Sequence, residues 1–200
     1  MNEVFAAALE LQAVCEKQGW RFCFIGGIAV QRWGEPRFTD DADLTLLTGF
    51  NGEETFVDHL LQHFHPRRKD AKEFALRNRV LVLENIVKVP LDIALGAFPF
   101  EVASIARASV FHFPTGQSLI TCSAEDLIVH KCFANRDLDW IDVDRILARQ
   151  RGKLNLDLIR AELKPLLELK GEPENAVRLD KLIIRHAQPF KMIKPTKPGE

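Results

Sequence analysis

The sequence predicts an α/β fold (an α+β arrangement), in which a mixed β-sheet is flanked by helices and followed by a helical region. Through residue 121, short apolar runs typical of buried strands alternate with apolar positions at helical spacing. Beyond that point the spacing is helical only. Two hundred residues can bury a substantial core. We therefore expect an α/β domain over 1–122, a helical region packing on it over 123–188, and a flexible tail over 189–200.

Periodicity and chain breakers place the elements of the first part. Helical spacing over 3–18 stops at Gly19, and helix-like residues 27–33 stop at Gly34 and Pro36. Because Pro90 cannot donate to a β-ladder, the strand that contains it should lie at a sheet edge or contain a bulge. The expected strands are 21–25, 42–47, 74–76, 80–83 and 87–95, with a hairpin of 110–113 and 118–121; the further helices are 54–63 and 100–107.

The second part reads as consecutive helices. Ser123 is a favourable N-cap with Asp126 three residues later, so a helix should begin there and run to about residue 134. Apolar spacing predicts three more helices, over 138–149, 156–169 and 176–187. The closing residues are rich in proline and lysine, which favours the flexible tail.

Composition excludes several classes of protein. Hydrophobic residues make up 46% and charged residues 28%, as in ordinary globular proteins, and no apolar run reaches membrane-spanning length. An acidic residue near the N-terminus argues against a signal peptide, so we expect a cytoplasmic protein. Four scattered cysteines form no C-x-x-C pair and should be free, buried thiols. The net charge of −1 gives no strong indication of nucleic-acid binding.

The strand over 42–47 carries the first candidate site. Asp41 and Asp43 are two residues apart, so their side chains should point to the same face. Two carboxylates that close repel each other, and a bound divalent cation is the simplest means of keeping both ionised. Asp40 points the other way and is given no metal role; turn hydrogen bonding or pairing with Arg37 suits it better. Asp92, alone among apolar strand residues, is costly to bury unless it is paired or bound to metal.

A glycine pair lies about fifteen residues before these acids, ahead of a helix. Gly26 and Gly27 can be explained by a tight turn with positive φ. The same turn would expose backbone N–H groups to a phosphate at the helix N-terminus. Carboxylates that bind a metal ion, together with backbone groups that bind phosphate, are typical of enzymes that transfer phosphoryl or nucleotidyl groups.

The strand, Gly-Gly, helix and Asp-x-Asp order of FIGGIAVQRWGEPRFTDDADLTLL resembles the nucleotidyltransferase superfamily related to DNA polymerase beta. The resemblance implies the mixed sheet flanked by helices, and it implies a third acidic residue on a later strand, for which Asp92 is the candidate. It further implies that Asp41, Asp43 and Asp92 are catalytic and together bind two Mg²⁺ or Mn²⁺ ions. Where family members often have Ser, this chain has Gly27, so that phosphate contact must come from the backbone or from Thr39.

The segment SAEDLIVHKCFANRDLDWIDVDRIL looks like the helical motif of abortive-infection (AbiE-type) toxin nucleotidyltransferases. The resemblance implies that Lys131 contacts the triphosphate, and Arg37 and Thr39 match an Arg-x-Thr that could also do so. From its helical spacing, Lys131 must either extend to solvent or reach a charged partner.

The acids that follow Lys131 are candidates for support. Asp142 could hold Arg145 and Arg149 in place or orient Lys131, and Asp137 is a second candidate; an ordinary salt-bridged helix surface explains both equally well. Arg67-Arg68-Lys69 and Arg77-x-Arg79 are secondary candidates for contacts with an RNA backbone.

The resemblance implies transfer of a nucleoside monophosphate from ATP or another NTP to an acceptor hydroxyl, with release of pyrophosphate. A tRNA 3′ end is the favoured acceptor, a protein hydroxyl or a small molecule stays open, and a cognate antitoxin is a possible partner. The alternative is a non-catalytic, antitoxin-like module that binds nucleotide or a partner. Three retained carboxylates argue against that alternative, because without a metal they only repel one another.

Overall fold

A computed structural model describes residues 2–187, and these form one mixed β-sheet with helices on both faces. The strand order is β3-β4-β5-β2-β1-β7-β6. The β2–β5 and β1–β7 pairs are parallel and the others antiparallel. The strands are β1 (Phe22–Phe24), β2 (Ala42–Leu47), β3 (His65–Pro66), β4 (Val80–Glu84), β5 (Pro90–Gly96), β6 (Ser109–His112) and β7 (Ser118–Thr121).

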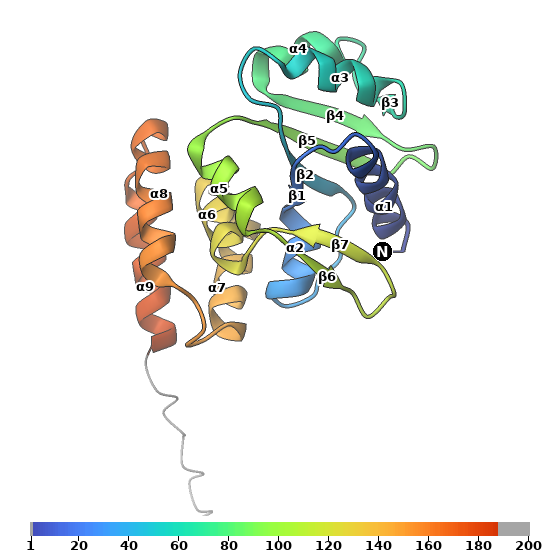
Figure 1. The fold of residues 1–200 in the computed structure, drawn as a ribbon. Coiled ribbons are helices and arrows are strands. Elements are labelled where there is room, and N and C mark those ends of the chain that lie inside the picture. Colours follow the sequence, from blue (N-terminus) through green and yellow to red (C-terminus); the bar gives the residue numbers. More distant parts are fainter. Residues whose placement is uncertain (1, 188–200) are drawn as a thin grey trace, which may run out of the picture.

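The helices divide between the two faces of the sheet (Figure 1). Helices α1 (Asn2–Lys17), α3 (Glu53–Leu61) and α4 (Ala71–Asn78) pack on one face. The other face is covered by α2 (Gly26–Trp33), α5 (Pro99–Arg107), α6 (Ala124–Ala134), α7 (Asp137–Arg149), α8 (Leu156–Lys170) and α9 (Glu174–Ala187). The predicted α/β fold class is confirmed.

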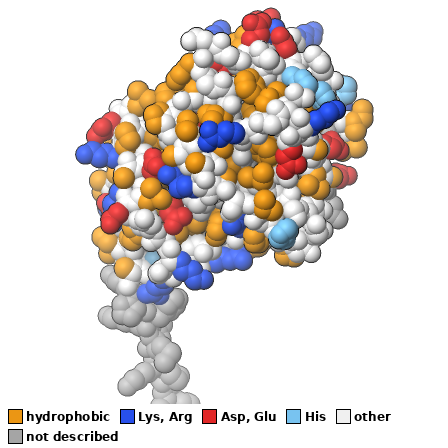
Figure 2. Space-filling model, in the orientation of Figure 1, with side chains coloured by type: hydrophobic (Ala, Val, Ile, Leu, Met, Phe, Trp, Pro, Cys, Tyr) orange, Lys and Arg blue, Asp and Glu red, His pale blue; other side chains and the backbone are white. Residues whose placement is uncertain are grey.

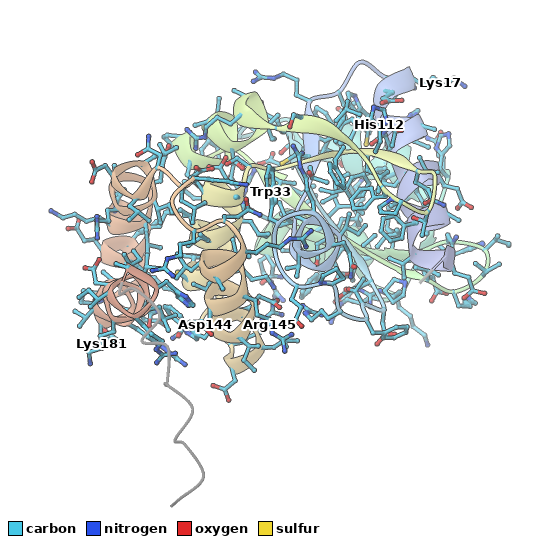
Figure 3. The ribbon with its side chains drawn as sticks, turned by 90° about the horizontal axis from the view of Figure 1, so that it is seen from below. Lys17, Trp33, His112, Asp144, Arg145 and Lys181 are labelled. Carbon is cyan, nitrogen blue, oxygen red and sulfur yellow. The ribbon has the colours of Figure 1, made fainter. Side chains whose placement is uncertain are left out.

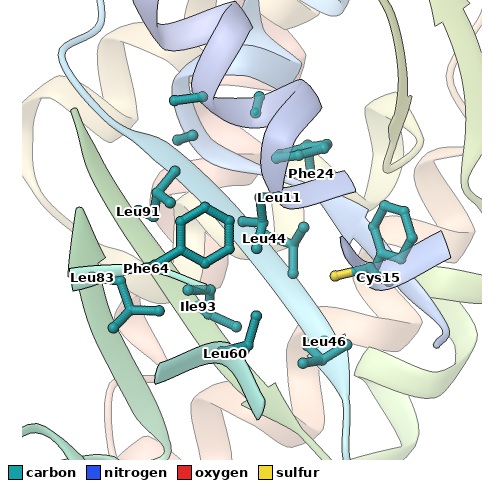
Figure 4. Packing of buried hydrophobic residues seen from close by; sticks show 14 of the residues in the cluster. Leu11, Cys15, Phe24, Leu44, Leu46, Leu60, Phe64, Leu83, Leu91 and Ile93 are labelled. Carbon is teal, nitrogen blue, oxygen red and sulfur yellow. The ribbon is translucent and has the colours of Figure 1, made fainter. Parts of the chain in front are cut away.

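Alternation along the central strands produces the first core cluster. Leu44 and Leu46 of β2 and Leu91 and Ile93 of β5 are fully buried and point to the face that α1, α3 and α4 cover (Figure 4). Because strand side chains alternate, the residues between them, Asp43 and Thr45 on β2 and Asp92 and Ala94 on β5, point to the opposite face. The hydrophobic pattern of these two strands therefore decides which face carries the acids.

The second core cluster lies on that opposite face and crosses residue 122. Cys23 and Ala29 from the first part pack in the same cluster as Cys122, Leu127 and the buried residues of α7, α8 and α9. The helical residues after 122 thus share a core with the sheet. A division into domains at residue 122 stays a prediction.

The strand predicted over 74–76 is wrong, since these residues belong to helix α4. Ala71 and Ala75, four residues apart, are buried on one side of the helix, and Arg79 ends it in a left-handed conformation. The short apolar run of Phe74, Ala75 and Leu76 is thus helical packing surface, which a three-residue run cannot distinguish from a strand.

The expectation that the Pro90 strand lies at an edge or contains a bulge is also wrong, since its residues pair one to one with both neighbouring strands. β5 is an interior strand between β4 and β2, and it begins at Pro90 rather than at residue 87. Residues before it form a turn in which Lys88 has φ 68° and the backbone N–H of Val89 donates to Asn85 Oδ1 at 3.0 Å. A proline at the first strand position disturbs no ladder, so it is tolerated inside the sheet.

The other predicted elements are confirmed within a few residues, and the structure adds the two-residue strand β3. All four cysteines are free and buried, as expected. The predicted tail over 189–200 lies outside the described residues. Among residues 2–187, no helix has the length and apolarity needed to cross a membrane.

Candidate metal and nucleotide site

Three carboxylates meet at the start of β2 and β5. Asp43 of β2 is directly paired with Asp92 of β5 in the parallel ladder, and Asp41 lies just before β2. One oxygen from each of the three lies within 4.8 Å of the others, and no other group of three potential ligands is found within residues 2–187. We call Asp41, Asp43 and Asp92 the acidic trio. An all-oxygen, anionic donor set is what Mg²⁺ and Mn²⁺ prefer, so the residues fit such an ion.

The electrostatics of the trio favour binding of a cation. Burial, followed by repulsion from Asp41 and Asp92, raises the pKa of Asp43 to about 6, although Lys131 and Arg136 act in the opposite direction. Burial also raises the pKa of Asp92, against the lowering effect of Arg67, which forms an ion pair with it. A divalent ion would relieve this repulsion and favour the ionised carboxylates.

The glycine pair allows helix α2 to begin directly against the trio. Gly26 has φ 55°, and a Cβ atom there would lie 1.8 Å from Asp43 Oδ2. A Cβ on Gly27 would lie 2.2 Å from Thr39 Oγ1. Both positions therefore require glycine for close approach, and Gly26 also requires it for its backbone conformation. The cap residue Ile25 provides no side-chain hydrogen bond, so the first N–H groups of α2 keep their capacity for a ligand.

Thr39 and Arg37 both have partners inside the protein. The Thr39 hydroxyl donates to Asp41 Oδ1 at 3.0 Å, so it positions that carboxylate. Arg37 donates through Nε and Nη2 to the two carboxylate oxygens of Asp142, each at 2.9 Å. The suggested pairing of Arg37 with Asp40 is therefore wrong; Asp40 is exposed at the rim of the site.

Lys131 reaches a charged partner rather than solvent. Its Nζ donates to Asp139 Oδ1 at 2.8 Å and lies 2.9 Å from Asp142 Oδ2, and all three residues are buried. Burial opposes ionisation of both aspartates, yet hydrogen bonds from Arg37, Arg136 and Lys131 lower the pKa of each below its usual value. Behind the site, the buried Lys131, Asp139 and Asp142 are thus paired with one another and with two less buried arginines.

Helix α7 also holds the segment between α2 and the trio. Arg145 pairs with Glu35 at 3.0 Å, Gln150 Nε2 donates to the carbonyl of Trp33 at 2.9 Å, and Arg149 donates to the carbonyl of Gly34. The Trp33 indole N–H donates to the Cys122 carbonyl at 2.8 Å. Figure 3 shows Arg145 and Trp33 along this junction. One interpretation of the spacing was that Asp142 holds Arg145 and Arg149 in place. That interpretation is wrong, because these two arginines contact residues 35 and 34 instead.

A polar cavity of about 380 Å³ opens in front of these groups. The predicted site residues that line it are Gly27, Arg37, Thr39, Asp41, Asp43, Asp92 and Lys131. Gly26 touches the trio from the side and Asp142 lies behind Lys131. Asp137 lies elsewhere, lining a separate surface hollow with Trp140 and Arg178.

Two charged residues of the cavity, Arg136 and Asp139, were not predicted as site residues from the sequence. Asp139 accepts hydrogen bonds from Lys131 and from Arg136 Nε, the latter at 2.7 Å, while the Arg136 side chain is 76% exposed. Asn135 adopts a left-handed conformation between α6 and α7, so helical register could not be extended from Lys131 to Asp139. The three-residue spacing of Arg136 and Asp139, which places them on the same side of a helix, was the available signal.

The basic clusters have partners of their own. Arg67 pairs with Asp92, Arg68 with Asp70 at 3.0 Å, and Arg79 with Glu53. These three arginines are therefore engaged within the protein. A role for the clusters in RNA contact stays a prediction.

The fold of this chain is similar to that of solved structures. The sequence matches no family model and no curated protein. The structure is similar to the crystal structure of an antigenic nucleotidyltransferase-like protein from Paracoccidioides brasiliensis, with a TM-score of 0.53 and 12% identity over 90% of this chain and 93% of that one. A solution structure of the antibiotic-resistance factor ANT(2'')-Ia is matched more distantly, with a TM-score of 0.44 and 16% identity over 92% of each chain. The chain therefore has the fold of a nucleotidyltransferase-like protein.

Proposed function

We propose that this chain is a metal-dependent nucleotidyltransferase, which transfers a nucleoside monophosphate from an NTP to an acceptor hydroxyl and releases pyrophosphate. The acidic trio carries the proposal: three carboxylate oxygens within 4.8 Å of one another, beside a helix that begins with two glycines. The nucleotidyltransferase-like fold supports it. So does the Gly-Gly and Asp-x-Asp resemblance of the sequence.

Asp41, Asp43 and Asp92 would hold Mg²⁺ or Mn²⁺, as one or two ions. Such ions neutralise charge on the phosphates and favour deprotonation of an attacking hydroxyl. The backbone N–H groups at Gly26 and Gly27 would bind phosphate oxygens, with the positive end of the α2 dipole behind them. Arg136, exposed at the cavity, would pair with the triphosphate, and buried Lys131 would contribute positive charge close to it.

In the proposed reaction, the acceptor oxygen attacks the α-phosphorus. A new bond forms between that oxygen and phosphorus, and the bond to the oxygen bridging the α- and β-phosphates breaks. Pyrophosphate leaves with that electron pair. The proton of the acceptor hydroxyl passes to Asp92, whose side chain lines the cavity and is one-third exposed.

An RNA 3′ end, as in tRNA, is our first choice of acceptor, on the sequence resemblance; a protein hydroxyl and a small molecule are the other classes. The test incubates the chain with each of four α-³²P-labelled NTPs, Mg²⁺ or Mn²⁺, and total tRNA or cell lysate. Asp41→Asn/Asp43→Asn removes charge from the trio with little change in shape. Asp137→Asn, an acid on α7 outside the cavity, is the matched control.

We expect label on an acceptor with the unmodified chain and with Asp137→Asn, and none with the double variant. The labelled fraction, whether RNA, protein or small molecule, identifies the acceptor class. Binding of metal and NTP by calorimetry without any transfer would instead favour a non-catalytic binding module. Failure to bind any divalent ion would contradict the proposal altogether.

A further inference from the structure

A second cavity, of about 250 Å³, lies on the same face of the sheet as the acidic trio. We call it the aromatic cavity; its walls include Thr45 of β2, Ala94 of β5, Phe98 and Phe100 at the start of α5, and His130 and Phe133 of α6. Phe98, Phe133 and Leu169 at its rim are each more than one-third exposed. Figure 2 shows hydrophobic side chains gathering around α5 on this side of the molecule. Exposed apolar surface around a hollow marks a binding site more often than chance exposure does.

Two polar groups in this cavity have no partner within the described chain. Oγ1 of Thr45 and Nε2 of His130 are buried and make no hydrogen bond. Thr45 is only 1% exposed, so its hydroxyl cannot rely on water. Leaving such groups unsatisfied destabilises the protein, and a ligand with matching groups would recover that loss. Burial lowers the pKa of His130 to about 4, so its ring is neutral at pH 7 and offers one donor and one acceptor nitrogen.

The shape of the cavity favours a flat ring. The rings of Phe100 and His130 lie 4.9 Å apart at 60°, and Phe98 and Phe133 add two further aromatic walls. An apolar protein cavity of roughly 150 Å³ can hold benzene. The volume of about 250 Å³ therefore accommodates one ring system of one or two rings, but not a complete nucleotide.

The aromatic cavity adjoins the acidic trio along both central strands. Thr45 follows Asp43 by two residues and Ala94 follows Asp92 by two, and these pairs are in register across the ladder. Two residues along a strand span about 7 Å. On the neighbouring helix, His130 directly precedes Lys131. A ligand whose phosphates lie at the trio could thus extend a ring into the aromatic cavity across the length of a ribose.

We propose that the aromatic cavity binds the base of the nucleoside triphosphate, with Thr45 and His130 hydrogen-bonding to the edge of the ring. This inference rests on the proposed function, because it assigns the base of the same donor nucleotide. It makes Thr45, Ala94 and His130 the residues that set the preferred NTP.

The experiment measures binding by calorimetry with Mn²⁺ present, using non-hydrolysable α,β-methylene analogues of the four NTPs and inorganic tripolyphosphate. Ala94→Leu fills the aromatic cavity, and Thr45→Val removes the hydroxyl while keeping the shape. Ala106→Leu, the same change at an exposed position of α5, is the control. We expect Ala94→Leu to weaken the favoured analogue by about tenfold or more, and Thr45→Val to weaken it by a smaller factor. Tripolyphosphate should bind all variants equally well, which also shows that they are folded.

The cavity inference alone is overturned by the following result: tripolyphosphate and the analogues bind the unmodified chain, and both cavity variants bind the analogues as tightly as the unmodified chain does. It is also overturned if the analogues bind no more tightly than tripolyphosphate, since the base then contributes nothing. If neither analogue nor tripolyphosphate binds, the proposed function fails, and this inference fails with it.

Discussion

At the scale of single residues, Gly26 allows the backbone to approach the acidic trio closely. Its positive φ and the 1.8 Å separation between a hypothetical Cβ and Asp43 Oδ2 mean that any side chain must displace that carboxylate. The glycine is therefore a requirement of the site as well as of the turn.

Gly26→Ala should cost roughly 1 kcal/mol or more in unfolding free energy and weaken Mn²⁺ binding by at least about tenfold. Gly19→Ala is the matched control, because Gly19 has φ 66° but open space around it. It should lose similar stability and keep its Mn²⁺ affinity. Calorimetric Mn²⁺ titration with urea unfolding checks both, and equal Mn²⁺ affinity in the two variants would refute the close-approach argument.

The raised pKa of Asp43 makes metal binding dependent on pH in the acid range. The ion binds the ionised carboxylate, and the pKa is about 6, so affinity for Mn²⁺ should fall as pH decreases from 7 to 5. An ordinary aspartate would remain ionised over this range. Mn²⁺ titrations from pH 5 to 8 measure the effect, and constant affinity across that range would show that Asp43 is not the ligand described here.

The same shift has the opposite consequence for stability without metal. A carboxyl whose folded-state pKa lies above its unfolded value favours the folded state when protonated, so stability falls as pH rises from about 4 through 6. Asp43→Asn should therefore raise the melting temperature of the metal-free protein at pH 8 and lose that advantage near pH 4. A lower melting temperature for the variant at pH 8 would contradict this electrostatic account.

At the scale of elements, ion pairs fasten α6, α7 and the segment before β2 to one another. Lys131 of α6 contacts Asp139 and Asp142 of α7, and Asp142 also holds Arg37. Lys131 and both aspartates are buried, so removing the lysine takes one cationic partner from each aspartate. Asp139 keeps Arg136 and Asp142 keeps Arg37.

Lys131→Met should therefore destabilise the fold by about 1.5–3 kcal/mol, since two buried carboxylates each lose a charged hydrogen-bond partner. Arg160→Met removes an arginine from the half-exposed pair of Arg160 and Asp180, and should cost about 0–1 kcal/mol. Urea unfolding compares the two. A loss below about 1 kcal/mol for Lys131→Met would show that the network is as weak as a surface pair.

Those features of the site that depend on the local spacing of residues could be predicted from the sequence. Asp41 and Asp43 could be selected because two-residue alternation assigns strand side chains to a face. Asp92 could be selected because a lone carboxyl among apolar strand residues is costly to bury. Asp139 was missed and Asp137 chosen because a left-handed residue, Asn135, resets the register between α6 and α7. The interior position of the Pro90 strand, and the pairing of Arg37 with Asp142 over 105 residues, depend on tertiary contacts that local pattern does not carry.

At the scale of the whole molecule, one core cluster joins the sheet to the C-terminal helices. Trp20 packs with the sheet-side core, whereas Trp140 is buried among the helices. Because Cys23, Ala29, Cys122 and Leu127 share one cluster, we expect the two parts to unfold together.

Variants that keep only Trp20 or only Trp140, with the other tryptophans changed to Phe, can report each part separately by fluorescence. Their urea midpoints should coincide after correction for the stability of each variant. Two transitions in a single variant, followed by fluorescence and by circular dichroism, would instead favour separate domains on either side of residue 122.

The measurement that tests the central claim most directly compares α-³²P-ATP with γ-³²P-ATP, or the other NTPs labelled in the same two ways, in parallel reactions with Mg²⁺ and the acceptor fraction. Nucleotidyl transfer leaves the α-label on the acceptor and the γ-label in pyrophosphate, and both should vanish in Asp41→Asn/Asp43→Asn. Label from the γ-position on the acceptor would mean phosphoryl transfer instead, and would contradict the function proposed for the acidic trio.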